Sequence, residues 1–163
     1  MVKVIERTNR IYWGELRGSS AADDKGATFL YGSTIRFYKR DHVYFENRLM
    51  VSGQCIHEWG SSWNFQGYRT LPALPLLKRG EIYLLKASME LEPVESVYLK
   101  IIFLDRYEKE IEVKISKSQE MEFQYPKEAY TYRIQLLSAG INEMNFHYLT
   151  LTLKDKKDDK VKR

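Results

Sequence analysis

The sequence predicts an all-β protein built as an antiparallel β-sandwich of about ten strands. Three observations support this fold class. Nearly every apolar stretch alternates with period two, which is the side-chain period of a half-buried strand. Aromatic residues are abundant, with 12 Tyr, 7 Phe and 3 Trp among 163 residues, and these residue types favour the pleated surface of a sheet. Turn signals separate the stretches at the spacing expected of a sandwich.

The first half of the chain contains five short segments with strand patterns. They are residues 11–16, 28–31, 34–38, 43–46 and 55–59. Between the first two lies a segment of small and polar residues, from Gly18 to Gly26. These side chains have little to bury, so we expect a loop there.

The second half contains six segments with clearer alternation. They are residues 81–91, 97–103, 111–115, 121–125, 130–136 and 144–152. In residues 81–91, every second side chain from Tyr83 to Leu91 is apolar, so these side chains share one face. Two antiparallel sheets packed face to face would bury the inward side chains of each.

The formal charge of +4 is concentrated at the end of the chain. Residues 154–163 contain six Lys or Arg and three Asp, a net charge of +3, so residues 1–153 carry only +1. A nucleic-acid-binding domain gathers its charge on a folded face, so the charge distribution argues against nucleic acid as a partner. We expect a single domain, residues 1–153, followed by a flexible charged tail, residues 154–163.

Three further features favour a soluble cytosolic protein. No apolar stretch approaches the roughly twenty residues of a membrane span. The N-terminal residues lack the apolar region of an ordinary secretory signal. Cys55 is the only cysteine, which excludes an internal disulfide and a zinc site with several cysteines.

Two of the expected strands are apolar on both faces, although a sandwich strand needs only one buried face. In residues 96–104 the second face carries Tyr98, Ile102 and Leu104, with Lys100 among them. In the last strand it carries His147, Leu149, Leu151 and Leu153. Two interpretations stay open. A loop of the same chain covers this second face, or the face is a docking surface for a partner protein.

One segment, residues 56–69, combines His, Glu, Trp, Tyr and Arg side chains with flexible Gly and Ser. Adjacent strand residues point to opposite faces, so His57 and Glu58 would not address one metal ion or one substrate atom together. By the same rule Cys55 and His57 share a face, but no third group orients such a dyad. We therefore predict no catalytic, cofactor-binding or metal-binding residue and no enzyme activity.

The tryptophans have two interpretations. They either stack against sugar rings or lie in the core, where aromatic side chains contribute most to burial. The core is favoured for Trp13, whereas the two interpretations are nearly even for Trp63. The predicted partner- or glycan-binding residues are His57, Glu58, Trp59, Trp63, Tyr68, Arg69, Tyr98, Ile102, Leu149 and Leu151.

Residues 71–153 resemble a jelly-roll carbohydrate-binding module. The shared features are a Leu-Pro segment, a Gly before a Tyr-bearing strand, and a Pro-containing turn before an aromatic strand. The last strand often carries acidic residues in such modules, whereas here Tyr148 to Thr152 take that place. This departure argues against binding of calcium or sugar of the kind seen in those modules.

Most of the chain also resembles the smallest of the three accessory secretory proteins of the accessory Sec system of Gram-positive bacteria. The order and spacing of several short segments carry this resemblance. They are Ile11-Tyr12-Trp13-Gly14, Tyr31-Gly32-Ser33, Phe45-Glu46-Asn47-Arg48-Leu49-Met50, Ile56-His57-Glu58-Trp59, Leu74-Pro75-Leu76-Leu77, Arg79-Gly80, Tyr125-Pro126, Ala129-Tyr130 and Leu136-Leu137.

This second resemblance implies a cytoplasmic, non-enzymatic β-sandwich that acts as an adaptor. Its implied partners are the two larger accessory secretory proteins, the SecA-type motor ATPase and the glycosylated serine-rich adhesin that the system exports. Contact with the inner face of the membrane would be peripheral at most. The alternative is a glycan-binding module that recognises N-acetylglucosamine or glucose on glycoproteins.

Overall fold

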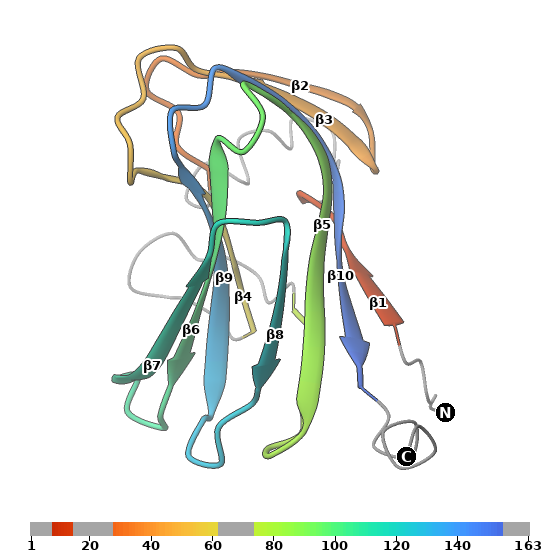
Figure 1. The fold of residues 1–163 in the computed structure, drawn as a ribbon, viewed down its shortest axis with the longest axis vertical. Coiled ribbons are helices and arrows are strands. Elements are labelled where there is room, and N and C mark those ends of the chain that lie inside the picture. The colour runs from red at the N-terminus through yellow and green to blue at the C-terminus, as the bar shows by residue number, and fades with distance from the viewer. Residues whose placement is uncertain (1–7, 15–27, 62–73, 155–163) are drawn as a thin grey trace.

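The computed structural model describes residues 8–14, 28–61 and 74–154, and it shows a β-sandwich of ten strands in this part of the chain (Figure 1). The strands are β1 (Thr8–Ile11), β2 (Thr34–Lys39), β3 (His42–Glu46), β4 (Cys55–Gly60), β5 (Ile82–Glu92), β6 (Val97–Leu104), β7 (Glu110–Ser116), β8 (Glu120–Gln124), β9 (Thr131–Ser138) and β10 (Glu143–Leu153). The all-β fold class and the expected number of strands are confirmed.

Two antiparallel sheets make up the sandwich. Sheet A has the strand order β2-β3-β10-β5-β8, and sheet B has the order β4-β9-β6-β7. One edge of β10 pairs with β5 along most of its length, while the other edge pairs first with β3 and then with β1. The chain crosses repeatedly between the sheets, so β5 and β6 lie in different layers although they are consecutive (Figure 1).

The core lies between the sheets and is built from the alternate side chains that the sequence pattern identifies. In β5 the side chains of Tyr83, Leu85, Ala87 and Met89 are all buried. Their counterparts on sheet B include Leu99 and other side chains with almost no exposed area. These are Ile101, Phe103, Ile134 and Leu136.

The N-terminal part of the sandwich differs from the expectation. The first strand covers Thr8–Ile11, and residues 12–14 are not in a strand. Residues 15–16 and the expected loop from Gly18 to Gly26 lie outside the described residues. Residues 28–31 contribute one isolated bridge, between Thr28 and His57. The backbone then turns, since the Ser33 N–H donates to the Leu30 carbonyl at 3.0 Å. Because the backbone turns within residues 28–33, the segment 28–31 is too short to form a ladder of strand pairs.

Candidate functional site

His57, whose residue type is the one most often used in catalysis and metal binding, lies in the core. It is on β4, opposite the buried Leu136 of β9. Its Nε2–H donates to the Trp13 carbonyl at 2.8 Å, and its Nδ1 accepts from the Thr28 hydroxyl. The imidazole stacks on the Trp13 ring at 4.1 Å and meets the Trp59 ring edge-on at 4.5 Å. Burial lowers the pKa of His57 to about 3, so the ring is neutral and holds the core together.

Cys55 and His57 do not share a face, contrary to the expectation from their spacing. The register of β4 against β9 shifts between them, so Cys55 lies opposite Leu137 and His57 lies opposite Leu136. A β-bulge of this kind inserts one residue and reverses the alternation. Burial raises the pKa of the Cys55 thiol to about 12. A protonated thiol on the other side of the sheet does not form a nucleophilic dyad with His57.

Of the residues predicted in segment 56–69, Glu58 is on the outer face of sheet B. Its carboxylate accepts from Gln135 Nε2 at 2.8 Å and lies 4.0 Å from Arg133. Trp59 is buried beside His57, and its indole N–H donates to the Tyr12 carbonyl at 2.8 Å. His57 and Trp59 are therefore core residues, and the interpretation of Trp59 as a sugar-stacking platform is wrong for this structure. Trp63, Tyr68 and Arg69 lie outside the described residues.

The prediction of a second apolar face on the last strand is also wrong. The register of β10 shifts between Phe146 and Tyr148, so His147 is an extra residue in the strand. Met144 and Phe146 face the core before this bulge, and Leu149 and Leu151 face it afterwards. Leu149 and Leu151 are fully buried, so they do not form a docking surface. The strand has one apolar face whose parity changes at the bulge.

In β6, by contrast, the second apolar face is real. Val97, Leu99, Ile101 and Phe103 face the core, while the alternate residues point outward from sheet B. Ile102 lies between Arg133 of β9 and Val113 of β7 on this outer face. Ile102 and Leu104 are buried although they do not belong to the main core, and Tyr98 is half-buried.

Strand β7 extends this outer apolar surface in an unusual way. Its apolar residues point outward, where Val113 and Ile115 are 38% and 55% exposed. Its charged residues Glu112 and Lys114 are on the same face as the core residues of β6. The Lys114 ammonium donates to the Glu122 carbonyl of β8 at 3.2 Å, across the edge of the sandwich. We call Tyr98, Ile102, Leu104, Val113 and Ile115 the outer apolar row.

The outer face of sheet A carries a cluster of aromatic and cationic residues that the sequence reasoning missed. Tyr12 and Tyr148 meet edge-on at 6.3 Å. The Arg10 guanidinium lies 4.4 Å from the Tyr148 ring centre, and the Arg40 guanidinium lies 4.4 Å from that of Tyr12. Each pair has the geometry of a cation–π contact. The bulge in β10 turns Tyr148 outward, so simple alternation could not reveal this cluster.

Two histidines lie on the same face. The His42 Nε2–H donates to the Asn145 side chain at 2.8 Å. His147 donates from Nδ1 to the Asp41 carbonyl and from Nε2 to Glu90, at 2.8 and 2.9 Å. Partial burial lowers the pKa of His147, but the bonds to Glu90 and Asp41 outweigh it and leave the pKa above its ordinary value. Because both nitrogens donate, His147 is best satisfied as a cation.

The described residues contain neither a metal-binding cluster nor a membrane-spanning helix. In residues 8–14, 28–61 and 74–154, no three His, Cys, Asp or Glu side chains gather closely enough to hold a metal ion. Within the same part of the chain, no helix has the length and apolar character needed to cross a membrane.

A family model and a sequence relative place the chain in the same protein family. The family model described as "Accessory Sec secretory system ASP3" matches residues 28–153. The accessory Sec system protein ASP3 of Streptococcus gordonii is 55% identical over 148 residues, which cover 90% of this chain and 93% of that protein. The resemblance to the smallest accessory secretory protein is confirmed.

Solved structures agree with this sequence relationship. A chain in the crystal structure of accessory secretory proteins 1, 2 and 3 from Streptococcus pneumoniae has a TM-score of 0.79 and 36% identity. It covers 94% of this chain and 100% of that chain. A chain of the Glycosylation Associate Protein (Gap123) complex from Streptococcus agalactiae has a TM-score of 0.76 and 34% identity, over 91% of this chain and 45% of that chain.

The likeness to carbohydrate-binding modules is one of fold. The xylanase 10B structure of Clostridium thermocellum, which contains a CBM22-1 module, has a TM-score of 0.51 and 14% identity. It covers 90% of this chain and 27% of that chain. This confirms the expected sandwich architecture, and at this identity it carries no information about ligands.

Proposed function

The chain belongs to the ASP3 family of the accessory Sec secretory system, and from this membership we propose that it is a non-enzymatic adaptor that assembles with accessory secretory proteins 1 and 2. One observation carries the proposal. The whole of a chain that was crystallised with those proteins superimposes on this one with a TM-score of 0.79. A fold retained over the full length of a complex subunit supports retention of its docking surfaces.

The absence of catalysis is part of the proposal, and two features support it. His57 is buried and neutral, and its ring nitrogens are occupied by Trp13 and Thr28. Cys55 is protonated and lies on the opposite face of β4. A general base must reach the proton that it abstracts, and His57 is enclosed by aromatic rings.

The adaptor would work on the cytoplasmic side of the membrane. From the family resemblance we infer that the assembled complex meets the SecA-type motor ATPase and the glycosylated serine-rich adhesin. Membrane contact would be peripheral, at most about 1 kcal/mol per Lys or Arg near the surface.

The outer apolar row supplies one docking surface in this proposal, through its accessible members Tyr98, Val113 and Ile115. Ile102 and Leu104 lie buried beneath this surface. Exposed apolar side chains on a sheet face mark interaction sites when they are contiguous. Val113 and Ile115 extend the row to the edge of sheet B, where a protein partner can reach them. We assign this surface to one of the two accessory secretory proteins.

Co-expression with accessory secretory proteins 1 and 2, followed by size-exclusion chromatography, tests the adaptor role. We expect all three chains to elute together. The double variant Val113→Thr/Ile115→Thr keeps β-branched residues in β7, so it should fold normally but bind at least about tenfold more weakly. The matched control is Leu76→Ser, which changes an exposed apolar residue elsewhere. A chain that elutes alone in every mixture would refute the adaptor role.

Glycan binding is the second candidate, and the outer face of sheet A favours it. Tyr12, Tyr148, His42 and Asn145 bring ring surfaces and hydrogen-bonding groups together there. Titration with N-acetylglucosamine and glucose polymers, followed by tryptophan fluorescence, tests this candidate. If Trp63 stacks on a sugar, Trp63→Ala abolishes the shift; if the tyrosines do, Tyr148→Ala weakens binding and Trp63→Ala does not. No response to the panel removes the candidate.

A further inference from the structure

Two neighbouring turns between strands expose four apolar side chains. Leu30 and Tyr31 belong to the turn before β2 and are 43% and 77% exposed. Leu49 and Val51 belong to the connection from β3 to β4 and are 73% and 68% exposed. We call these four residues the apolar tip. Single exposed apolar residues are normal, but a group of them marks an interaction site.

Asn47 joins the two turns. Its side chain is buried, and its Nδ2 donates to the Tyr31 carbonyl at 2.8 Å and to the Ser33 hydroxyl at 2.9 Å. Its Oδ1 accepts from the Leu49 N–H at 2.9 Å. All of the side chain's polar atoms are therefore used to hold Tyr31 and Leu49 in fixed positions.

Close packing leaves little space between the turns. Gly32 has a φ of +77°, which favours glycine, and a Cβ at this position would lie 3.5 Å from the Leu49 side chain. The Val51 carbonyl accepts from the Gln54 N–H at 3.2 Å, which closes the second turn. The apolar tip is thus built from turns with satisfied hydrogen bonds.

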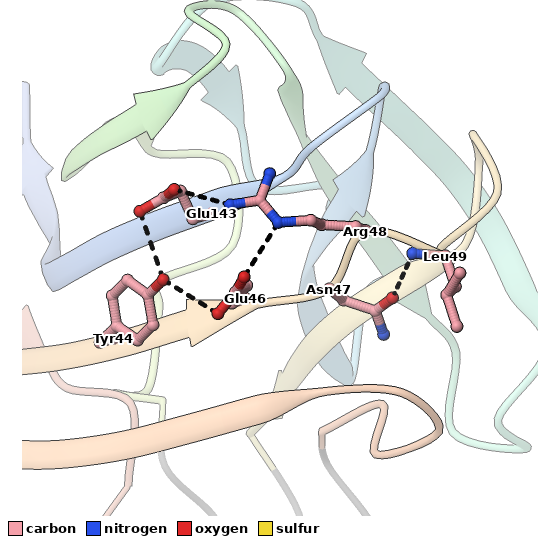
Figure 2. A network of polar contacts seen from close by, with 6 residues as sticks. All are labelled: Tyr44, Glu46, Asn47, Arg48, Leu49 and Glu143. Carbon is pink, nitrogen blue, oxygen red and sulfur yellow. Dashed lines mark hydrogen bonds and ion pairs between the residues drawn. The ribbon is translucent and has the colours of Figure 1, made fainter.

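A ring of polar contacts fixes the base of the tip (Figure 2). The Tyr44 hydroxyl lies 3.2 Å from both Glu46 and Glu143, so the two carboxylates share its one proton. Arg48 donates to the same two carboxylates at 2.9 and 3.1 Å. Figure 2 shows Arg48 on one side of the chain and Asn47 on the other, with Leu49 following. The charges beside the tip are therefore paired with one another.

We propose that the apolar tip inserts into an apolar pocket on one of the two accessory secretory proteins, as a second docking surface distinct from the outer apolar row. This inference rests on the proposed adaptor function. A preorganised tip loses little conformational entropy on binding. A buried aromatic anchor, surrounded by a polar rim, is the usual centre of a protein interface, and Tyr31 with its neighbours and the paired Arg48 fits that description.

The charged groups beside the apolar tip favour an apolar pocket on a protein, rather than a membrane, as its binding site. A loop that inserts into an anionic bilayer is normally accompanied by unpaired Lys or Arg. Here Arg48 is held by two carboxylates, Glu46 and Glu143. The tip also lies inside the region that matches the family, residues 28–153, and similar chains were crystallised together with two other proteins.

The test uses the full chain and the purified pair of accessory secretory proteins, with Kd measured by biolayer interferometry. We expect Leu49→Ser/Val51→Ser to raise Kd at least about tenfold, and Tyr31→Ser on the other turn to do the same. Leu76→Ser, at a residue that is 92% exposed, should leave Kd unchanged. All variants should keep the wild-type melting temperature, because each removes an exposed side chain.

The outcomes separate the two proposals. If wild type binds the pair and the tip variants bind equally well, the tip is not a docking surface and the adaptor function stands. If wild type does not bind, the adaptor function itself fails. Two other results would overturn the tip proposal. One is binding to phosphatidylglycerol vesicles that the variants lose. The other is self-association, seen by sedimentation, that the variants lose without any change in Kd for the pair.

Discussion

At the scale of single residues, His57 makes the free energy of unfolding depend on pH. It packs against Trp13 and Trp59 and donates and accepts one hydrogen bond each. Its pKa is about 3 in the folded protein, compared with an ordinary value of 6.5. Between these values the unfolded chain binds the proton and the folded chain does not, so the stabilising contribution is present above pH 6.5 and falls as the pH decreases towards 3.

We therefore predict that lowering the pH from 7 to 5 costs wild type about 2 kcal/mol of unfolding free energy through His57. His57→Gln keeps one donor and one acceptor but cannot titrate, so it should lose this component. Urea denaturation of both proteins at several pH values gives the difference. Wild type must be compared with His57→Gln because the raised pKa of His147 increases the unfolding free energy as the pH falls, which opposes the effect of His57. Parallel pH curves for the two proteins would contradict the assignment.

Asn47 gives a second prediction at this scale. Asn47→Ala removes three hydrogen bonds and leaves the Tyr31 carbonyl, the Ser33 hydroxyl and the Leu49 N–H without this partner. We expect a loss of about 1–3 kcal/mol, measured as a decrease in melting temperature by calorimetry. The control is Ser118→Ala, whose hydroxyl makes only exposed contacts. Equal melting temperatures for wild type and Asn47→Ala would show that Asn47 does not hold the turns together.

At the scale of elements, β10 shows how one inserted residue determines which side chains reach the core. His147 is the extra residue between Phe146 and Tyr148. If His147 were instead paired in a regular ladder, alternation from Phe146 would point Tyr148, Thr150 and Thr152 into the core. Leu149 and Leu151 would then point outward.

We predict that insertion of one alanine between Tyr148 and Leu149 prevents folding, whereas deletion of His147 leaves the fold intact. The insertion turns Leu149 and Leu151 away from the core. The deletion removes the bulge, keeps the remaining residues of β10 on their present faces and loses a surface ion pair with Glu90, worth about 1 kcal/mol or less. Circular dichroism and gel filtration distinguish the two variants. A soluble, cooperatively unfolding insertion variant would show that the inward position of Leu149 and Leu151 is not needed.

The same strands explain which parts of the fold could be predicted from sequence. Alternation is a local property, so the existence of β5, β6 and β9 followed from their residues. A bulge is visible only when a strand is paired, and the sequence reasoning therefore misplaced Cys55 in β4 and Leu149 and Leu151 in β10. In β7, alternation could not tell which face meets the core, because the apolar residues of this edge strand point outward.

At the scale of the whole molecule, our expectation that nucleic acid is not a partner rests on the division of charge between body and tail. Residues 1–153 carry +1. On the described surface, some charged groups form ion pairs, such as Arg48 with Glu46 and Lys154 with Glu122. The features that stand out on this surface are apolar and aromatic. They suit protein or glycan contact better than a phosphate backbone.

The last prediction follows from that division. Lys154 still belongs to the sandwich, since its backbone N–H donates to the Ile82 carbonyl at 2.9 Å. Residues 155–163 contain five Lys or Arg and three Asp, a net charge of +2. We expect a chain that ends at Lys154 to keep its melting temperature within about 2 °C and to co-elute with accessory secretory proteins 1 and 2. A truncated chain that folds but elutes alone would place the tail in the interface and show that the charge was divided wrongly.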